Sequence, residues 1–255
     1  MAELDARRQQ LKDAFVAARG YWSPLWDGVL ALSPEFFEAY TAFSSVPWQH
    51  GTLPAKLKEL VYVAVDASTT HLYNPGTRIH IANALRHGAT RDEVMEVLQL
   101  VSVLGIHTMT TGLPILVDEL CKAGRGEEVA TGVLTPEQEA VKAAFIAARG
   151  YWTPVWEQML ALSPEFFDAY TRLSSVPWTH GTLEPKVKEL LYVAIDAATT
   201  HLYLPGTRVH IQNALRHGAT VGEVMEVLEL TAAIGIHTIT EGVPILLEEA
   251  AKAGV

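Results

Sequence analysis

The feature that most constrains this 255-residue chain is that one unit is written twice. Equivalent positions lie 130 residues apart, and the register runs without a gap from Lys12 and Lys142 to Gly124 and Gly254. Two copies are too few to build a solenoid, so we expect two similar units that pack together. The ten histidines all obey the repeat, as the pairs His50/His180, His71/His201, His80/His210, His87/His217 and His107/His237.

The two copies agree best in a polar block that covers residues 66–90 and 196–220. Only four positions change there: Ser68/Ala198, Asn74/Leu204, Ile79/Val209 and Ala82/Gln212. By contrast, segment 101–104 is completely replaced in 231–234, which is how packing positions behave when side-chain volume is roughly kept. We therefore expect the chemistry to lie in the polar block.

The periodicity of the chain predicts an all-α fold. Apolar residues recur at helical spacing, and no run alternates apolar and polar residues long enough to make a strand. A polar, glycine-containing linker at 125–132 separates the two copies. We therefore place two helical domains at residues 1–129 and 130–255, packed as an internal pseudo-dimer.

Stop and start signals locate the helices around the polar block. Pro75-Gly76 should break the chain, so we expect a helix over 54–69 and a new one that begins at Thr77. Gly88 is placed to end that helix, and Thr90 with Glu93 forms a capping box for the next one.

Composition excludes several classes of protein. A net charge of −10 argues against nucleic acid and against an anionic membrane surface as partners. Cys121 is the only cysteine and its equivalent is Ala251, so no disulfide or duplicated thiol site is expected.

The start, Met1–Arg8, is charged with no apolar run after it, which predicts a cytoplasmic protein. The apolar stretch Val94–Val117 contains polar residues and is expected to be a buried helix pair rather than a membrane span.

The sequence resembles the carboxymuconolactone decarboxylase and alkylhydroperoxidase-D-like family over most of each unit. The resemblance rests on Lys58-Glu59-Leu60, Thr70-His71, Arg78-Ile79-His80, Gly88-Ala89-Thr90 and Glu93, all within the first copy. The peroxidase branch of this family carries a cysteine pair before its histidine, but Tyr73 and Gly76 stand at those places here. Thiol peroxidase activity is therefore excluded, because that chemistry needs a thiolate and a resolving thiol. The decarboxylase branch implies a lyase that acts on a small carboxylated compound, lactone-like or derived from aromatic catabolism.

The resemblance also implies catalytic residues and an assembly. Arg78 would hold the carboxylate and His80 would transfer the proton, since an imidazole has an ordinary pKa of about 6.5. Glu59, or Asp66 seven residues later, would orient the histidine. Family members are often hexameric, so three tandem chains should form a pseudo-hexamer. The equivalent catalytic residues in the second copy are Arg208, His210 and Glu189.

Arg78 and His80 are separated by two positions, so on a regular helix their side chains diverge. We therefore also consider His71 as catalytic, and Thr70, Tyr73, His107 and Trp48 as substrate-binding. Their equivalents are His201, Thr200, Tyr203, His237 and Trp178.

Two alternatives stay open. No cofactor is expected for a proton-transfer lyase, yet three histidines per unit, His71, His80 and His107, could hold a divalent metal, with His201 and His210 as further ligands in the second copy. The other alternative is a non-catalytic ligand-binding or assembly module, in which the polar block only organises a buried network.

Overall fold

The computed structural model describes residues 4–254. Residues 1–3 and 255, which belong to the two predicted domains and to the charged start, lie outside the described residues. The first copy forms α1 (Ala6–Arg19), α2 (Leu25–Leu32), α3 (Pro34–His50), α4 (Ala55–Ala67), α5 (Asn74–Arg86), α6 (Arg91–Ser102) and α7 (His107–Lys122). The second copy forms α8 (Pro136–Arg149), α9 (Pro154–Leu162), α10 (Pro164–Thr179), α11 (Pro185–Ala197), α12 (Leu204–Arg216), α13 (Val221–Ala232) and α14 (His237–Ala253). Short 3₁₀ segments cover Val103–Ile106, Gly126–Val129 and Ala233–Ile236. The predicted all-α fold is confirmed, with no strand within residues 4–254.

Local signals explain most of the helix ends. The capping box of Thr90 and Glu93 is present at the start of α6, and Gly88 adopts the left-handed conformation after α5. The predicted start at Thr77 is wrong, because α5 begins at Asn74. Pro75 and Gly76 form its first turn, where the missing N–H of proline costs no helical hydrogen bond.

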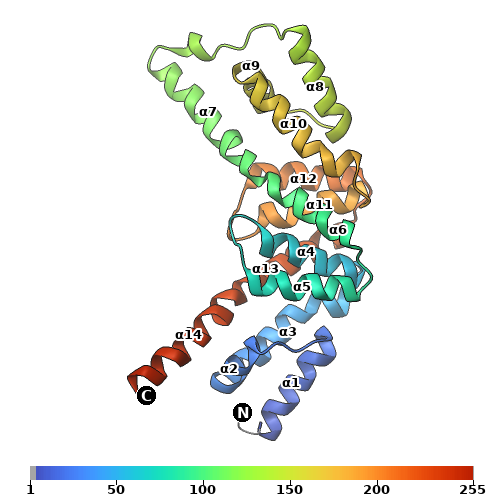
Figure 1. Cartoon of the computed structure of the whole chain (residues 1–255), viewed down its shortest axis with the longest axis vertical. Helices are drawn as coiled ribbons and strands as arrows, with labels where there is room; N and C mark the ends of the chain where they lie inside the picture. Colours follow the sequence, from blue (N-terminus) through green and yellow to red (C-terminus); the bar gives the residue numbers. More distant parts are fainter. Residues whose placement is uncertain (1–3, 255) are drawn as a thin grey trace.

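The middle of the molecule is a layer of α4, α5 and α6 packed against α11, α12 and α13 (Figure 1). Buried ion pairs join the two copies in this layer. Nζ of Lys58 lies 2.9 Å from Oε1 of Glu226, and Oε2 of Glu226 accepts hydrogen bonds from the backbone N–H groups of Thr52 and Leu53. Lys188 and Glu96 repeat this arrangement. Each copy therefore supplies a carboxylate that caps a loop of the other.

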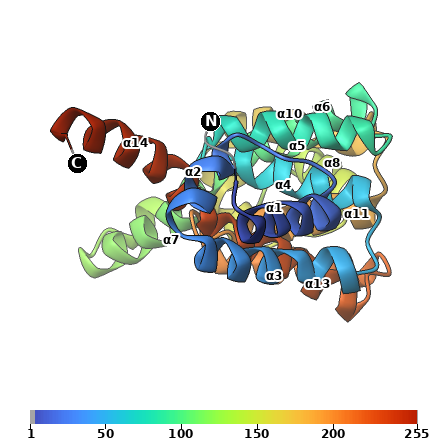
Figure 2. The same ribbon diagram turned by 90° about the horizontal axis from the view of Figure 1, so that it is seen from below.

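The two ends of the molecule are formed by exchanged helices. α14 packs against α2 of the first copy, and α7 packs against α9 of the second. One end core contains Phe15, Trp26 and Phe37 together with Ile236 from the second copy. The other end core contains the equivalent residues Phe145, Trp156 and Phe167 together with Ile106 from the first copy. Both exchanged helices project from the same side of the molecule (Figure 2).

The expectation of a buried helix pair over Val94–Val117 holds for α6 but not for α7. Only Leu113 of α7 is buried, whereas Ile115 and Leu116 are exposed. The continuous helical stretches Arg91–Lys122 and Val221–Ala253 are long and apolar enough to span a membrane by length and composition. This is weak evidence for a span, because the core helix of a soluble protein can pass the same test.

Candidate active site

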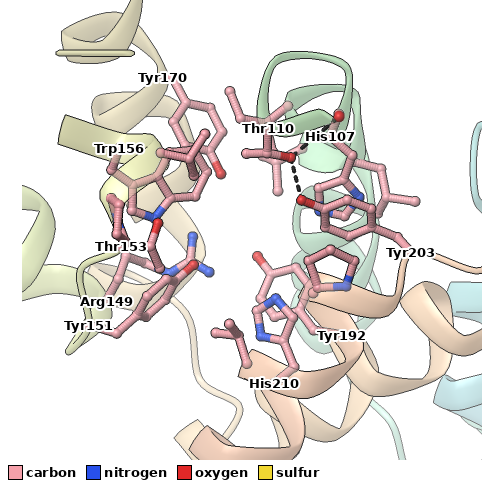
Figure 3. A pocket seen from close by; sticks show the side chains of 18 residues that line it. His107, Thr110, Arg149, Tyr151, Thr153, Trp156, Tyr170, Tyr192, Tyr203 and His210 are labelled. Carbon is pink, nitrogen blue, oxygen red and sulfur yellow. Dashed lines mark hydrogen bonds between the residues drawn. The ribbon is translucent and has the colours of Figure 1, made fainter. Parts of the chain in front are cut away.

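Each half of the molecule contains a cavity lined by aromatic side chains, and both copies contribute to each cavity. The second-copy cavity has a volume of about 270 Å³. Arg149, Tyr151, Trp156 and Tyr170 come from α8–α10 and lie on one side of it (Figure 3). His210 and Tyr192 lie on α12 and α11, and His107 and Thr110 come from the exchanged helix α7. The cavity therefore needs both copies to exist.

A histidine–glutamate pair lies at the base of each cavity. Nδ1 of His80 donates a hydrogen bond of 2.6 Å to Oε2 of Glu59, and both side chains are buried. Asn83 donates to the other oxygen of Glu59 at 3.2 Å. This contact fixes the ring orientation and leaves Nε2 as the free nitrogen. His210 and Glu189 repeat the pair with the same distance.

The arginine of each cavity is Arg19 or Arg149, a residue at the end of the first helix of its copy. Both are buried, with about 5% of their surface exposed. Nε of Arg19, and Nε and Nη1 of Arg149, have no hydrogen-bond partner in the described chain. Instead, the Arg19 guanidinium lies 5.0 Å from the ring centre of Trp48 and 5.4 Å from that of Tyr62. A buried cation with free N–H groups is suited to bind an anion.

Arg78 and Arg208 do not reach the cavities. Both are exposed on α5 and α12, whereas His80 and His210 point inward. The two positions that separate Arg78 from His80 turn their side chains to different faces of a regular helix. Arg78 and Arg208, which were expected to bind the anion, therefore do not line the cavities, whereas Arg19 and Arg149 do.

The structure also corrects the expected grouping of histidines. His107 does not lie with His71 and His80 of its own copy. Nδ1 of His107 lies 2.7 Å from Nε2 of His201, and Nδ1 of His237 lies 2.7 Å from Nε2 of His71. The exchange of α7 and α14 causes this crossing.

A buried aspartate lies between these groups. Neither carboxylate oxygen of Asp66 has a hydrogen-bond partner among residues 4–254. Oδ2 lies 4.0 Å from Nε2 of His80, and Oδ1 lies 3.7 Å from Nδ1 of His237. Burial, reinforced by Glu59, raises the pKa of Asp66 to about 8, and burial also lowers the pKa of His237 to about 3. Burial likewise raises the pKa of the equivalent Asp196 to about 7.

The remaining predicted residues separate into two groups. Tyr73 lines the first cavity, and its hydroxyl is 2.6 Å from that of Thr240; Tyr203 and Thr110 repeat this contact in the second. Trp48 and Trp178 lie behind the buried arginines rather than on the cavity wall. Thr70 and Thr200 are exposed. His71 is half-buried and lines an outer hollow.

The two cavities differ in size. The first has a volume of only about 40 Å³. Larger side chains line it at two positions, and a glycine on α2 lets Val243 and Leu247 of α14 approach closely. These three differences are Leu25/Val155, Ile79/Val209 and Gly28/Gln158, whereas Ala233 of the first cavity is smaller than its equivalent Val103 in the second.

Fold and site together define a duplicated helical protein whose paired cavities hold a His–Glu dyad and no thiol pair. The profile of the carboxymuconolactone decarboxylase family matches residues 34–115 and again 164–245, so the chain belongs to this family. No match is found among curated proteins. A crystal structure from Burkholderia xenovorans LB400, described as a "putative gamma-carboxymuconolactone decarboxylase subunit", superimposes with a TM-score of 0.92. The two sequences are 45% identical over 97% of this chain and 98% of that one.

Proposed function

We propose that the cavities decarboxylate a small cyclic carboxylate by proton transfer, and that the second-copy cavity, with about 270 Å³ against about 40 Å³, accommodates the substrate more readily. The observation that carries this proposal is the buried arginine with free N–H groups in the same aromatic cavity as the His–Glu dyad. An arginine without a carboxylate partner can bind an anionic group of the substrate. The dyad supplies a proton at a fixed nitrogen. Membership of the carboxymuconolactone decarboxylase family supports the same reaction class.

In the proposed reaction the guanidinium of Arg19 or Arg149 binds the carboxylate of the substrate. The bond between the ring carbon and the carboxylate breaks, carbon dioxide leaves, and the electron pair passes into the ring as a dienolate. Nε2 of His80 or His210 then protonates carbon, while the Nδ1 contact to Glu59 or Glu189 stabilises the imidazolium. Solvent returns the proton to the histidine.

The dimensions and lining of the cavity support a substrate class. The aromatic wall and the volume of about 270 Å³ suit a compound with one small planar ring. Gamma-carboxymuconolactone, which the name of the Burkholderia protein includes, is the first compound to test. The proposed reaction requires no redox cofactor, and we place the protein in the cytoplasm.

The test is a decarboxylation assay with gamma-carboxymuconolactone that follows carbon dioxide release. We expect His80→Gln with His210→Gln to lower kcat at least about 100-fold, since a general acid contributes that much. The matched control is His87→Gln with His217→Gln, because these exposed histidines lie just after α5 and α12. Full turnover by the His80/His210 variant would contradict the proposal, as would equal losses in the two variants.

A further inference from the structure

A second cluster of ligating side chains lies beside each catalytic dyad. In the first half it consists of Asp66, His71 and His237, and in the second half of Asp196, His201 and His107. In each cluster one ligating atom from each of the three residues lies within 4.8 Å of the others. The proposed decarboxylation uses none of these six residues.

The distances within the cluster are those of groups that surround a small cation. Nδ1 of His237 lies 3.7 Å from Oδ1 of Asp66, which is too far for a hydrogen bond. It also forms a hydrogen bond of 2.7 Å with Nε2 of His71, which a metal ion bound to both nitrogens would replace. Ligand atoms about 2.0–2.2 Å from one metal ion are separated by about 3–4 Å, so the pair of His237 and Asp66 is already in range, and the two histidine nitrogens would have to move apart by a few tenths of an ångström.

Asp66 lies in the cluster and also 4.0 Å from Nε2 of His80. Its carboxylate is fully buried, yet both oxygens lack a hydrogen bond among the described residues. Gly76 approaches so closely that a Cβ there would lie 2.0 Å from Oδ2 of Asp66, and Gly206 repeats this at Asp196. A buried, unpaired carboxylate is unfavourable unless it binds a cation or is protonated. The close approach of Gly76 to Asp66 in the first copy, and of Gly206 to Asp196 in the second, is therefore the same in both copies.

The histidine ligands are also held in place. Leu72, directly after His71, has a φ of 52°, and the equivalent Leu202 has a φ of 49°. A leucine in this left-handed region is strained, and such strain is retained where it positions a functional group. Tyr73 stacks on His237 with 3.8 Å between ring centres and thereby fixes that ring.

We propose that each cluster binds a divalent transition metal through two histidines and one aspartate, contributed by both copies. Two imidazoles and one carboxylate are a donor set for zinc, iron, cobalt or manganese that leaves coordination positions open. His237 and Tyr73 line both the cavity and an outer hollow at the surface, so the site has access to solvent and adjoins the substrate cavity. This inference does not depend on the proposed decarboxylation, because binding is measured without substrate.

Because each site takes ligands from both copies, the number of metal ions bound per chain distinguishes the variants described below. The metal-free full-length protein is titrated with Zn²⁺ by calorimetry and with Co²⁺ by visible absorption, and bound metal is measured after dialysis. We expect two metal ions per chain. His71→Ala with His237→Ala removes two ligands from one site, so one ion should remain. His71→Ala with His107→Ala removes one ligand from each site, and both affinities should fall by more than about 100-fold.

A control variant and three contrary outcomes complete the test of metal binding. The control, His87→Ala with His217→Ala, should keep two ions. If an alanine variant fails to fold, Asp66→Asn, which preserves the shape of the side chain, serves as the test and should lose one ion. The proposal is overturned if the wild type binds no stoichiometric metal, or if the His71/His107 variant still binds two ions with unchanged affinity. It is equally overturned if the His71/His107 variant keeps one tight site while the His71/His237 variant keeps none, because that would place each site within one copy.

Discussion

At the scale of single residues, the buried arginines are the most consequential groups of the proposed active site. Arg19→Met with Arg149→Met keeps side-chain length but removes the charge that would bind the substrate carboxylate. We expect KM to rise about 10- to 100-fold, because a hydrogen-bonded charge contributes roughly 1.5–3 kcal/mol. Steady-state kinetics with the carboxylated substrate measures this change. The matched control, Arg78→Met with Arg208→Met, should leave KM unaltered, because these arginines are exposed; a rise in the control alone would return the anion site to Arg78.

Only some residues of such a site can be predicted from the sequence. His80 and Tyr73 were identified because they lie in the repeated polar block, and Glu59 because the family resemblance includes it. Arg19 was missed because it lies in another helix, outside that block. A signal was available, since segment 17–22 recurs unchanged as 147–152 and places an arginine within aromatic residues. Arg78 was chosen because Arg78-Ile79-His80 fits the family resemblance, although two positions on a regular helix turn the side chains to different faces.

At the scale of elements, the start of α6 connects helix capping with an ion pair. Oε1 of Glu93 lies 2.8 Å from Nζ of Lys56, while its other oxygen accepts from the backbone N–H of Thr90. Partial burial alone would raise the pKa of Glu93, but Lys56 and Thr90 together hold it below its ordinary value. This carboxylate therefore adds stability above its ordinary pKa of 4.5, and that stability is lost as pH falls through the lower folded-state pKa. Glu223 and Lys186 repeat the arrangement on α13.

Glu93→Gln with Glu223→Gln should isolate the ion pairs, because glutamine can keep the cap, as Gln138 does with Thr135. At neutral pH we expect each substitution to lower the free energy of unfolding by about 0.5 kcal/mol. The difference from the wild type should vanish at a second, acidic pH below the lowered folded-state pKa, where the carboxylates are protonated. Urea denaturation at both pH values measures this. Thr90→Ala with Thr220→Ala should instead lose about 1 kcal/mol per cap at both values; a Gln variant that behaves in the same way would show that the cap alone matters.

Element types and caps were largely predictable, whereas one boundary was not. The capping boxes and glycine ends follow from short local motifs, so the sequence locates them well. The start of α5 was misplaced because Pro75-Gly76 reads as a break, although proline is tolerated in the first turn of a helix. The left-handed Leu72 was also unforeseen, since nothing about leucine favours that conformation.

At the scale of the whole molecule, the exchanged helices expose apolar surface. Ile115 and Leu116 on α7, and Ile245, Leu246 and Leu247 on α14, are all exposed. Grouped apolar side chains of this kind indicate an interaction surface. We expect chains of 27.9 kDa to associate as trimers, and light scattering after gel filtration measures the mass. Ile115→Glu with Ile245→Glu should yield single chains; a wild-type mass of one chain at micromolar concentration would refute the expected assembly.

The duplication predicted two packed units, but it did not predict which copy each last helix joins. α2 and α9 are similar in sequence, so α7 meets an equivalent surface on either one. Because the two arrangements satisfy the same local pattern, sequence alone does not distinguish between them. The structure selects the exchange, and the grouping of His107 with His201 follows from it.

The unequal cavities have an evolutionary meaning that depends on the covalent link between the copies. In a symmetric homodimer, one gene change alters both sites identically, so a change that suits one ligand is imposed on the other. In this chain Leu25 and Val155, or Ile79 and Val209, are encoded separately, and the sites have already diverged to about 40 and 270 Å³. Duplication within one chain thus releases each site from the selection acting on its twin, while every molecule still carries both in a fixed one-to-one ratio.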